Sequence, residues 1–89
     1  MLVDFHVHSN ASDGTEAPSK IVGMADGFTA LAITDHDNCD GVDEFLSTPS
    51  TVRRIAGVEL SIEPGDGFDK FHLLGLGVDF QNDRLKEFL

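Results

Sequence analysis

The N-terminal segment limits the possible folds more than any other part of this sequence. From Val3 to His8, apolar and polar residues alternate strictly, and the polar positions include His6 and His8. A period of two is typical of a β-strand with one apolar face, and it places side chains two residues apart on the same side. We therefore expect a strand near the N-terminus that presents His6 and His8 together.

Strand and helix patterns then take turns along the chain. Pro18 suits the first turn of a helix, Gly27 suits its C-terminal end, and Asp40 is placed to cap a short second helix that ends before Pro49. The other expected elements are strands at 28–33, 52–58 and 68–78, a turn at 64–67 and a last helix from Asn82 or Asp83. This order predicts parallel βαβ units, an α/β fold, with the last two strands as arms of a hairpin.

The balance of charges restricts the partners that the chain can bind directly. The 89 residues include 16 acidic and 6 basic side chains, which gives a net charge of −10. Such a chain repels phosphate backbones and offers no basic stripe for nucleic acid or anionic lipid. Arg53 and Arg54 form the only adjacent basic pair, and on a strand they point to opposite faces. Any phosphate substrate must therefore be met by bound cations.

Size and cysteine content bear on stability and compartment. With 40% hydrophobic residues the chain is too apolar to be disordered, but 89 residues build a modest core that depends on metal, a partner or further chain. Cys39 is the only cysteine, so no internal disulfide can form. The sequence shows neither the regions of a signal peptide nor a stretch long enough to span a membrane. We expect a cytoplasmic, soluble protein without a membrane partner.

Two kinds of candidate ligand stand near the N-terminus. His6 and His8 could bind one metal ion from adjacent positions, because neutral imidazole binds zinc, manganese and iron. Two histidines on one face of a strand are also common as polar surface. Asp13, directly before Gly14, is either a ligand on the loop after that strand or an ordinary turn residue. Taken alone, these residues leave both interpretations open.

The rest of the chain adds three further candidate ligands, namely His36, Glu59 and His72. Asp35, His36 and Asp37 follow an apolar strand, so they emerge together at its end. Glu59 ends the expected strand at 52–58, where a carboxylate is either a ligand or a group paired at the rim. His72 lies within a strongly apolar run, where a hydrogen-bonded core histidine is more common than a ligand.

Considered as a set, these candidates favour a metal site. They supply all four imidazoles of the chain and two carboxylates, each at a strand end or in the loop that follows. Such a mixture of nitrogen and oxygen donors suits two or three closely spaced divalent ions better than one structural zinc, which usually takes about four ligands including thiolates. The predicted metal ligands are His6, His8, Asp13, His36, Glu59 and His72.

The order of the motifs resembles the PHP (polymerase and histidinol phosphatase) family. The motifs are His6-Val7-His8-Ser9, Ser12-Asp13-Gly14 with Pro18, Ala32-Ile33-Thr34-Asp35-His36-Asp37, Gly57-Val58-Glu59 and His72-Leu73-Leu74-Gly75. They span nearly the whole chain. The likeness is to the bacterial phosphoesterases that hydrolyse nucleotides or trim RNA ends, more than to PHP domains embedded in polymerases.

This resemblance implies both a fold and a site. The fold is a distorted (β/α)7-type barrel, of which residues 1–89 form the N-terminal half, with three to four strands and their helices, so the barrel is not closed. Three metal groups are implied, namely His6, His8 and Glu59, then Asp13 with His36, then a bridging Glu59 with His72. The metals are manganese, zinc or iron. Asp4, Asp35 and Asp37 are candidates to orient the ligands.

The resemblance further implies hydrolysis of phosphate esters, with a metal-bridged water rather than a side chain as the nucleophile. The substrate is then a phosphate-ester small molecule or nucleotide, with RNA ends as a further class. The family uses later ligands that this chain lacks, so we expect either a fragment of a longer protein or a chain that completes itself by homo-oligomerisation or with a complementing chain. Two alternatives stay open: a metal-binding or partner-binding half-domain without turnover, and a small acidic domain with structural histidines.

Overall fold

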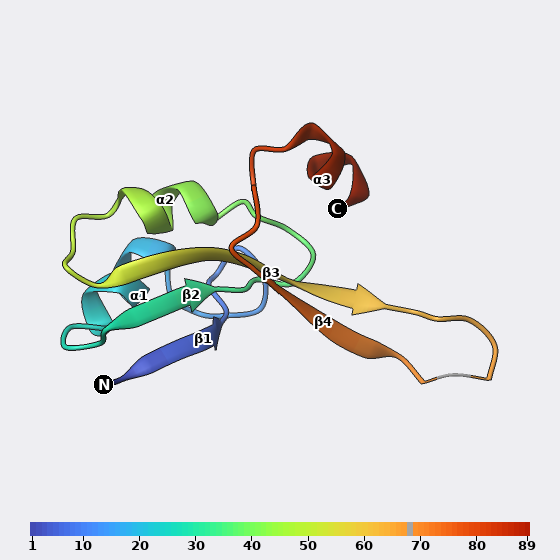
Figure 1. Ribbon diagram of the computed structural model, residues 1–89, viewed down its shortest axis with the longest axis horizontal. Helices are drawn as coiled ribbons and strands as arrows, with labels where there is room; N and C mark the ends of the chain where they lie inside the picture. The colour runs from blue at the N-terminus through green and yellow to red at the C-terminus, as the bar shows by residue number, and fades with distance from the viewer. Residues whose placement is uncertain (68) are drawn as a thin grey trace.

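The computed structural model describes residues 1–67 and 69–89. The elements follow one another as β1 (Val3–Val7), α1 (Pro18–Met24), β2 (Ala30–Ile33), α2 (Val42–Ser47), β3 (Arg53–Ile62), β4 (Phe71–Leu76) and α3 (Asp83–Phe88). The strands form one sheet in the order β1-β2-β3-β4, as Figure 1 shows. β1, β2 and β3 run parallel, and β4 pairs antiparallel with β3. The α/β prediction and the expected hairpin are confirmed, and the sheet does not close into a barrel.

One face of the sheet is covered by the first two helices. Leu31 and Ile33 alternate on β2 toward this face and pack with Val22 of α1 and with Val42 and Phe45 of α2. α1 and α2 also contact each other. These apolar side chains are less than 4% exposed, so their burial supplies the main stabilisation of the fold, at roughly 25 cal/mol per Å² of apolar surface.

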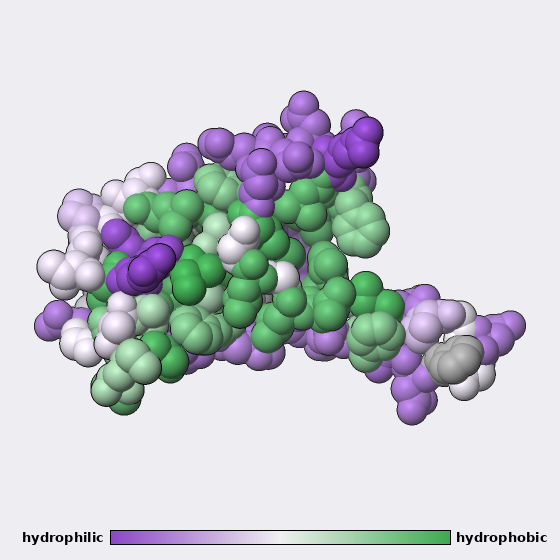
Figure 2. Space-filling model, viewed as in Figure 1, coloured by the Kyte–Doolittle hydropathy of each residue, from purple (hydrophilic) through white to green (hydrophobic). Residues whose placement is uncertain are grey.

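Apolar side chains lie exposed on the rest of the sheet. Val3 and Phe5 of β1 are about 40% exposed, and four apolar residues of β4 are exposed to a similar degree. Figure 2 shows hydrophobic residues gathered over the sheet and along the β3–β4 arm. The arm projects from the body and accounts for the long dimension of 45 Å (Figure 1). The alternation in β1 therefore predicts its strand but not burial of its apolar face.

β3 is longer than expected and changes its partner partway. The expected strand at 52–58 continues to Ile62, so Glu59 lies within β3 and not at its end, which corrects the prediction. Ala56 is the last residue in register with β2, opposite Ile33, and Gly57 is the first in register with β4, opposite Leu76. Pairing with β4 extends the strand, because the second half of β3 finds a new hydrogen-bonding edge.

The ends of the helices follow the sequence signals except at α2. Pro18 begins α1, Gly27 follows it with a φ of 89°, and the Asn82 side chain caps α3 by accepting a hydrogen bond from the Leu85 amide. The predicted cap by Asp40 is wrong. The capping position of α2 is occupied by Gly41, so Asp40 lies one residue too early.

Two further expectations concern β4 and the arginine pair. β4 runs from Phe71 to Leu76 and is therefore shorter than the expected strand at 68–78. The first residue of that expected strand lies outside the described residues. Arg54 donates hydrogen bonds to the carbonyls of Phe45 and Thr48 at the C-terminal end of α2, while Arg53 is exposed. Arg54 therefore satisfies helix carbonyls. None of the helices in the described ranges is long and apolar enough to cross a membrane.

Substitution of Gly57 tests the crowded point where β3 changes partner. A Cβ at Gly57 would lie 2.7 Å from the carbonyl oxygen of Ile33 and 2.9 Å from that of Gly75, and backbone atoms there cannot move aside. Gly57→Ala should lower the free energy of unfolding by about 1–3 kcal/mol in urea titrations. Gly23→Ala is the control, because a Cβ there meets nothing within 4 Å and alanine favours the helix by up to about 1 kcal/mol. Equal stability of the two variants would contradict this account of β3.

Candidate metal centre

The carboxylate of Glu59 lies at the centre of the site. Its side chain is only 3% exposed, and each of the four imidazoles of the chain contacts it. Oε1 contacts Nε2 of His6 and lies 2.8 Å from Nε2 of His8. Oε2 lies 2.6 Å from Nδ1 of His72 and 3.5 Å from Nδ1 of His36. One buried carboxylate therefore joins imidazoles from β1 and β4 and from the segments that follow β1 and β2.

The end of β1 supplies His6 and His8. The backbone amide of Val7, between them, donates a 3.0 Å hydrogen bond to Oγ1 of Thr34, and the Thr34 amide donates to the Val7 carbonyl at 2.7 Å. These bonds hold the end of β1 against the residue that follows β2. As predicted, His6 and His8 lie side by side, with ring centroids 5.2 Å apart.

The residues after β2 hold His36 beside Glu59. The Glu59 amide donates a 2.9 Å hydrogen bond to the Asp35 carbonyl, and the Asp37 amide donates a 3.0 Å bond to the Glu59 carbonyl. His36 therefore pairs with Glu59 as an isolated parallel bridge beyond the regular end of β2. Asp37 then has a φ of 55°, which is uncommon for a residue with a side chain, and its carboxylate accepts a 2.8 Å bond from the Ser61 amide.

Asp13 joins the site from the loop between β1 and α1. Its Oδ1 lies 2.7 Å from Nδ1 of His8, and its Oδ2 lies 3.1 Å from Nε2 of His36. The Asp13 side chain is 62% exposed, so its carboxylate sits at the open rim of the site. Asp13 is therefore more than a turn residue, because it spans two imidazoles from the segments that follow β1 and β2.

His72 lies on β4 and faces the site rather than the core. Its side chain is 56% exposed, and β4 pairs it with Ser61, two residues beyond Glu59 on β3. The interpretation of His72 as a core histidine is therefore wrong. The apolar run around it is the exposed hairpin strand, not a buried one.

The six predicted ligands form three overlapping groups. The potential ligand atoms within each group lie within 4.8 Å of one another. The groups are His6, His8 and Glu59, then His8, Asp13 and His36, and then His36, Glu59 and His72. Compared with the expected grouping, His8 joins the Asp13 group and His36 joins the His72 group. Nitrogen and oxygen donors at this spacing fit divalent zinc, manganese or iron.

The contacts shift the pKa values of the site in opposite directions. Burial opposes ionisation of Glu59, but hydrogen bonds with His8 and His6 outweigh it and lower the pKa of the carboxyl. Desolvation likewise opposes charge on His8, yet its hydrogen bonds with Glu59 and Asp13 raise the pKa of the imidazole. For Asp13, desolvation is outweighed by the hydrogen bond with His8 and the charges of His8 and His36, and the pKa of the carboxyl falls. The cluster thus favours protonated His8 between ionised carboxylates.

The three candidates to orient the ligands have different surroundings. The Asp4 carboxylate accepts a hydrogen bond from the backbone amide of His6 at 3.1 Å. A hydrogen bond from the Ser61 amide lowers the pKa of Asp37, and a smaller contribution comes from the Ser61 side chain. Asp35 is buried and accepts hydrogen bonds from Ser9 and Ser12 in the loop that carries Asp13. Their roles as orienting residues stay a prediction.

Sequence reasoning missed the polar residues that shape this loop. Ser9 is fully buried, and the Asn38 side-chain amide donates a 3.0 Å hydrogen bond to the Ala11 carbonyl. A serine directly after His8 and an Asn shortly after His36 were the available signals, but serine and asparagine are so common in loops that neither predicts such a contact.

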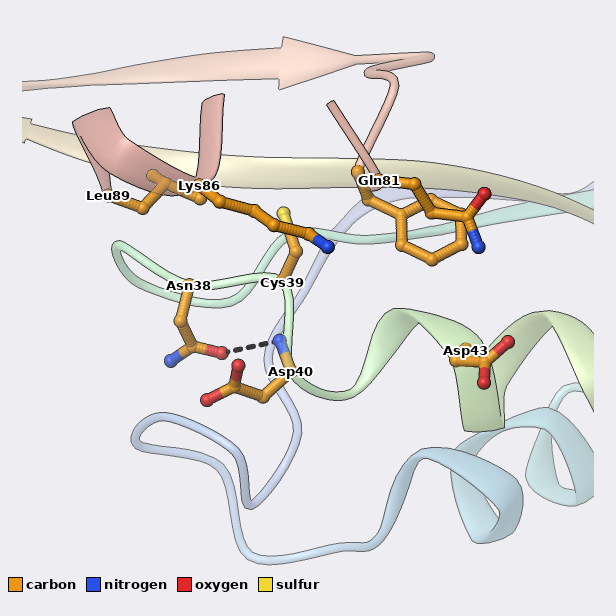
Figure 3. A pocket seen from close by; sticks show the side chains of 8 residues that line it. Asn38, Cys39, Asp40, Asp43, Gln81, Lys86 and Leu89 are labelled. Carbon is orange, nitrogen blue, oxygen red and sulfur yellow. Dashed lines mark hydrogen bonds between the residues drawn. The ribbon is translucent and has the colours of Figure 1, made fainter. Parts of the chain in front are cut away.

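The described surface has two hollows of similar volume, and only one of them includes a predicted ligand in its wall. An apolar groove of about 420 Å³ runs between β1 and α1 and includes His8 and Gly14 in its wall. A more polar cavity of similar volume lies under α3, where Lys86 extends over the loop that holds Asn38, Cys39 and Asp40 (Figure 3). Burial and nearby carboxylates raise the pKa of the Cys39 thiol. None of the predicted ligands lines this second cavity.

The pH dependence of stability in the metal-free protein follows from these shifts. The raised pKa of His8 stabilises the fold below the ordinary value of 6.5, and this contribution is lost as pH rises through the folded pKa. The lowered pKa of Glu59 stabilises the fold above its ordinary value of 4.5 and is lost as pH falls. Urea unfolding in EDTA should therefore show maximal stability between these values. His8→Gln should weaken the alkaline decline, and stability that rises steadily from about pH 6 to 8 would contradict the prediction.

Comparison with known proteins places the chain in a family. The PHP domain family matches residues 4–83. A 5′-3′ exoribonuclease of Haemophilus influenzae is 35% identical over 97% of this chain and 32% of its own length. A 3′,5′-nucleoside bisphosphate phosphatase of Chromobacterium violaceum is 35% identical over 86% of this chain and 28% of its own length.

A solved structure agrees with these relatives. A Bifidobacterium adolescentis protein assigned as a metal-dependent phosphoesterase is 30% identical, with a TM-score of 0.85 over 96% of this chain and 30% of its own length. The chain spans less than a third of the length of each of these proteins. Because the PHP match extends over most of its residues, the chain belongs to the PHP family.

Proposed function

We propose that this chain carries part of the active site of a metal-dependent phosphoesterase. The observation that carries the proposal is the contact of the Glu59 carboxylate with four imidazoles. A buried carboxylate surrounded by imidazoles, with no lysine or arginine in the set, is the environment of a shared metal ligand. Its two oxygens face different pairs of histidines, which suits a bridging role.

The nearest contacts support two ions that share Glu59. His6 and His8 would hold one ion with Oε1, and His36 and His72 the other with Oε2. Each ion would then have three protein ligands, and a zinc ion with three protein ligands keeps a position for water or substrate. The third group shares His8 and His36 with the other two, so Asp13 is the one described ligand that would be left unshared for a third ion.

Bound divalent ions would supply positive charge for a phosphate group and an activated water. The chain itself contributes the donors and the positions of their atoms. No basic side chain belongs to the described ligand groups, and the net charge is −10. The protein therefore attracts a phosphate ester only where cations reverse the local charge. The relatives are named for RNA and for a nucleoside bisphosphate, so we infer nucleotide or RNA-end phosphates as the substrate class.

The site also points to further polypeptide. The chain spans less than a third of its relatives, and apolar side chains of β1 and β4 are exposed. We propose that more of the same fold covers this surface and adds ligands, either from a longer chain, a second copy or a complementing chain. The alternative is a half-domain that binds metal without turnover. This alternative is favoured if no further polypeptide adds ligands to the three-donor groups.

Removal of the Glu59 charge should weaken the binding of both ions. Glu59→Gln keeps the size of the side chain but replaces a shared anionic ligand by an amide, so zinc affinity should fall about 100-fold or more, and both ions should be affected. Calorimetric titration with zinc, with metal content measured by elemental analysis, checks this. Glu63→Gln is the control, because Glu63 is 72% exposed and pairs with Lys70. Loss of a single ion, or equal effects of both substitutions, would contradict the bridging role.

Turnover separates the two proposed functions. The purified chain, freed of metal and then supplied with manganese, is incubated with a chromogenic phosphate monoester, a nucleoside 3′,5′-bisphosphate and 5′-phosphorylated RNA. We expect bound metal together with release of phosphate from the small esters or of nucleotides from the RNA, and Glu59→Gln should abolish this turnover. Metal binding without release of phosphate or nucleotides would support the half-domain instead. Absence of metal binding would reject both.

A further inference from the structure

Asp35 is a buried carboxylate that belongs to none of the three ligand groups. It is 2% exposed, and the hydrogen bonds that its side chain accepts come from the loop at residues 9–14, which joins β1 to α1. Oδ1 accepts from the Ser9 amide at 2.5 Å and from the Ser12 hydroxyl at 2.7 Å, and Oδ2 accepts from the Ser9 hydroxyl at 2.6 Å. One carboxylate thus fixes two residues of the loop.

Ser9 in turn accepts hydrogen bonds from other residues of the loop. Its carbonyl accepts hydrogen bonds from the amides of Ser12 and Gly14 at 3.2 and 2.9 Å, and its hydroxyl accepts one from the Ala11 amide at 3.1 Å. Gly14 lies so close to the preceding strand that a Cβ there would be 2.3 Å from the His8 carbonyl oxygen. The residues on both sides of Asp13 are therefore fixed.

A fixed loop matters because Asp13 itself is exposed. An exposed carboxylate gains little from ion pairs, since solvent screens them and an ordered side chain loses entropy. Yet Asp13 spans His8 at 2.7 Å and His36 at 3.1 Å, a geometry that requires its backbone to be held in place. Asp35 is adjacent to His36 in sequence, so the same stretch of chain positions His36 directly and Asp13 through the loop.

We propose that Asp35 is a positioning residue that holds Asp13 against His8 and His36 through Ser9 and Ser12. The proposal rests on the proposed function, since it concerns the same metal centre. A carboxylate suits this role because three donors converge on its two oxygens. Asparagine would turn an amide N–H toward one of these donors and leave that donor without its acceptor.

Hydrogen exchange of the metal-free protein tests whether Asp35 holds the loop. In Asp35→Asn the amides of Ser12 and Gly14 should exchange at least about 10-fold faster, while amides shared by β2 and β3 keep their protection. Ser12→Ala removes one of the three contacts from a partly exposed residue and should give a smaller change in the same amides. Asp26→Asn, at an exposed position, is the charge-matched control. Unchanged exchange in Asp35→Asn would overturn the proposal.

Zinc titration of the same variants tests whether Asp35 affects metal binding by positioning Asp13. Asp35→Asn should weaken zinc binding about 10- to 100-fold, as loss of an orienting contact does at other metal sites. In an Asp13→Asn background, Asp35→Asn should cause little further loss, because its effect passes through Asp13. An equal loss in both backgrounds would show a general structural role and overturn the proposal. If the wild-type chain binds no zinc, the proposed function fails, and the exchange experiment alone decides the role of Asp35.

Discussion

The placement of one buried carboxylate organises this molecule. An ionised carboxylate that is withdrawn from water is unfavourable unless opposite charges or hydrogen-bond donors surround it. Glu59 meets this requirement with four imidazoles, and each of them comes from a different position along the chain. The ends of β1 and β2 and the face of β4 must therefore converge on the middle of β3. The sheet order β1-β2-β3-β4 is the arrangement that allows this convergence.

Gly57 makes the convergence possible in the backbone. The first half of β3 runs parallel to β2, and the second half runs antiparallel to β4. Near this exchange the backbones of β2, β3 and β4 approach so closely that the carbonyls of Ile33 and Gly75 leave no space for a side chain at Gly57. Two residues later, Glu59 faces the extension of β2 on one side and β4 on the other. A single strand can thus present one carboxylate to histidines from both neighbours.

Local patterns in the sequence predicted most of this arrangement, and two of the misses share one cause. The alternation around His6 and His8, Pro18 and the position of Asn82 depend on neighbours in the chain, and their elements were predicted correctly. The length of β3 and the exposure of His72 depend on pairing between β3 and β4. An apolar run looks the same in a buried strand and in an exposed hairpin arm, so sequence alone could not separate the two environments.

The charges of the cluster bear on the metal binding that we propose for it. With the pKa of His8 raised and the pKa values of Glu59 and Asp13 lowered, protons on imidazole balance part of the negative charge. A divalent ion that binds there must displace such protons, since imidazole coordinates metal in its neutral form. Protons and metal ions therefore compete for the same nitrogens. Under the proposed function, the proton-stabilised cluster and the metal-loaded site would be two states of one charge balance, and the surrounding pH and metal concentration would decide between them.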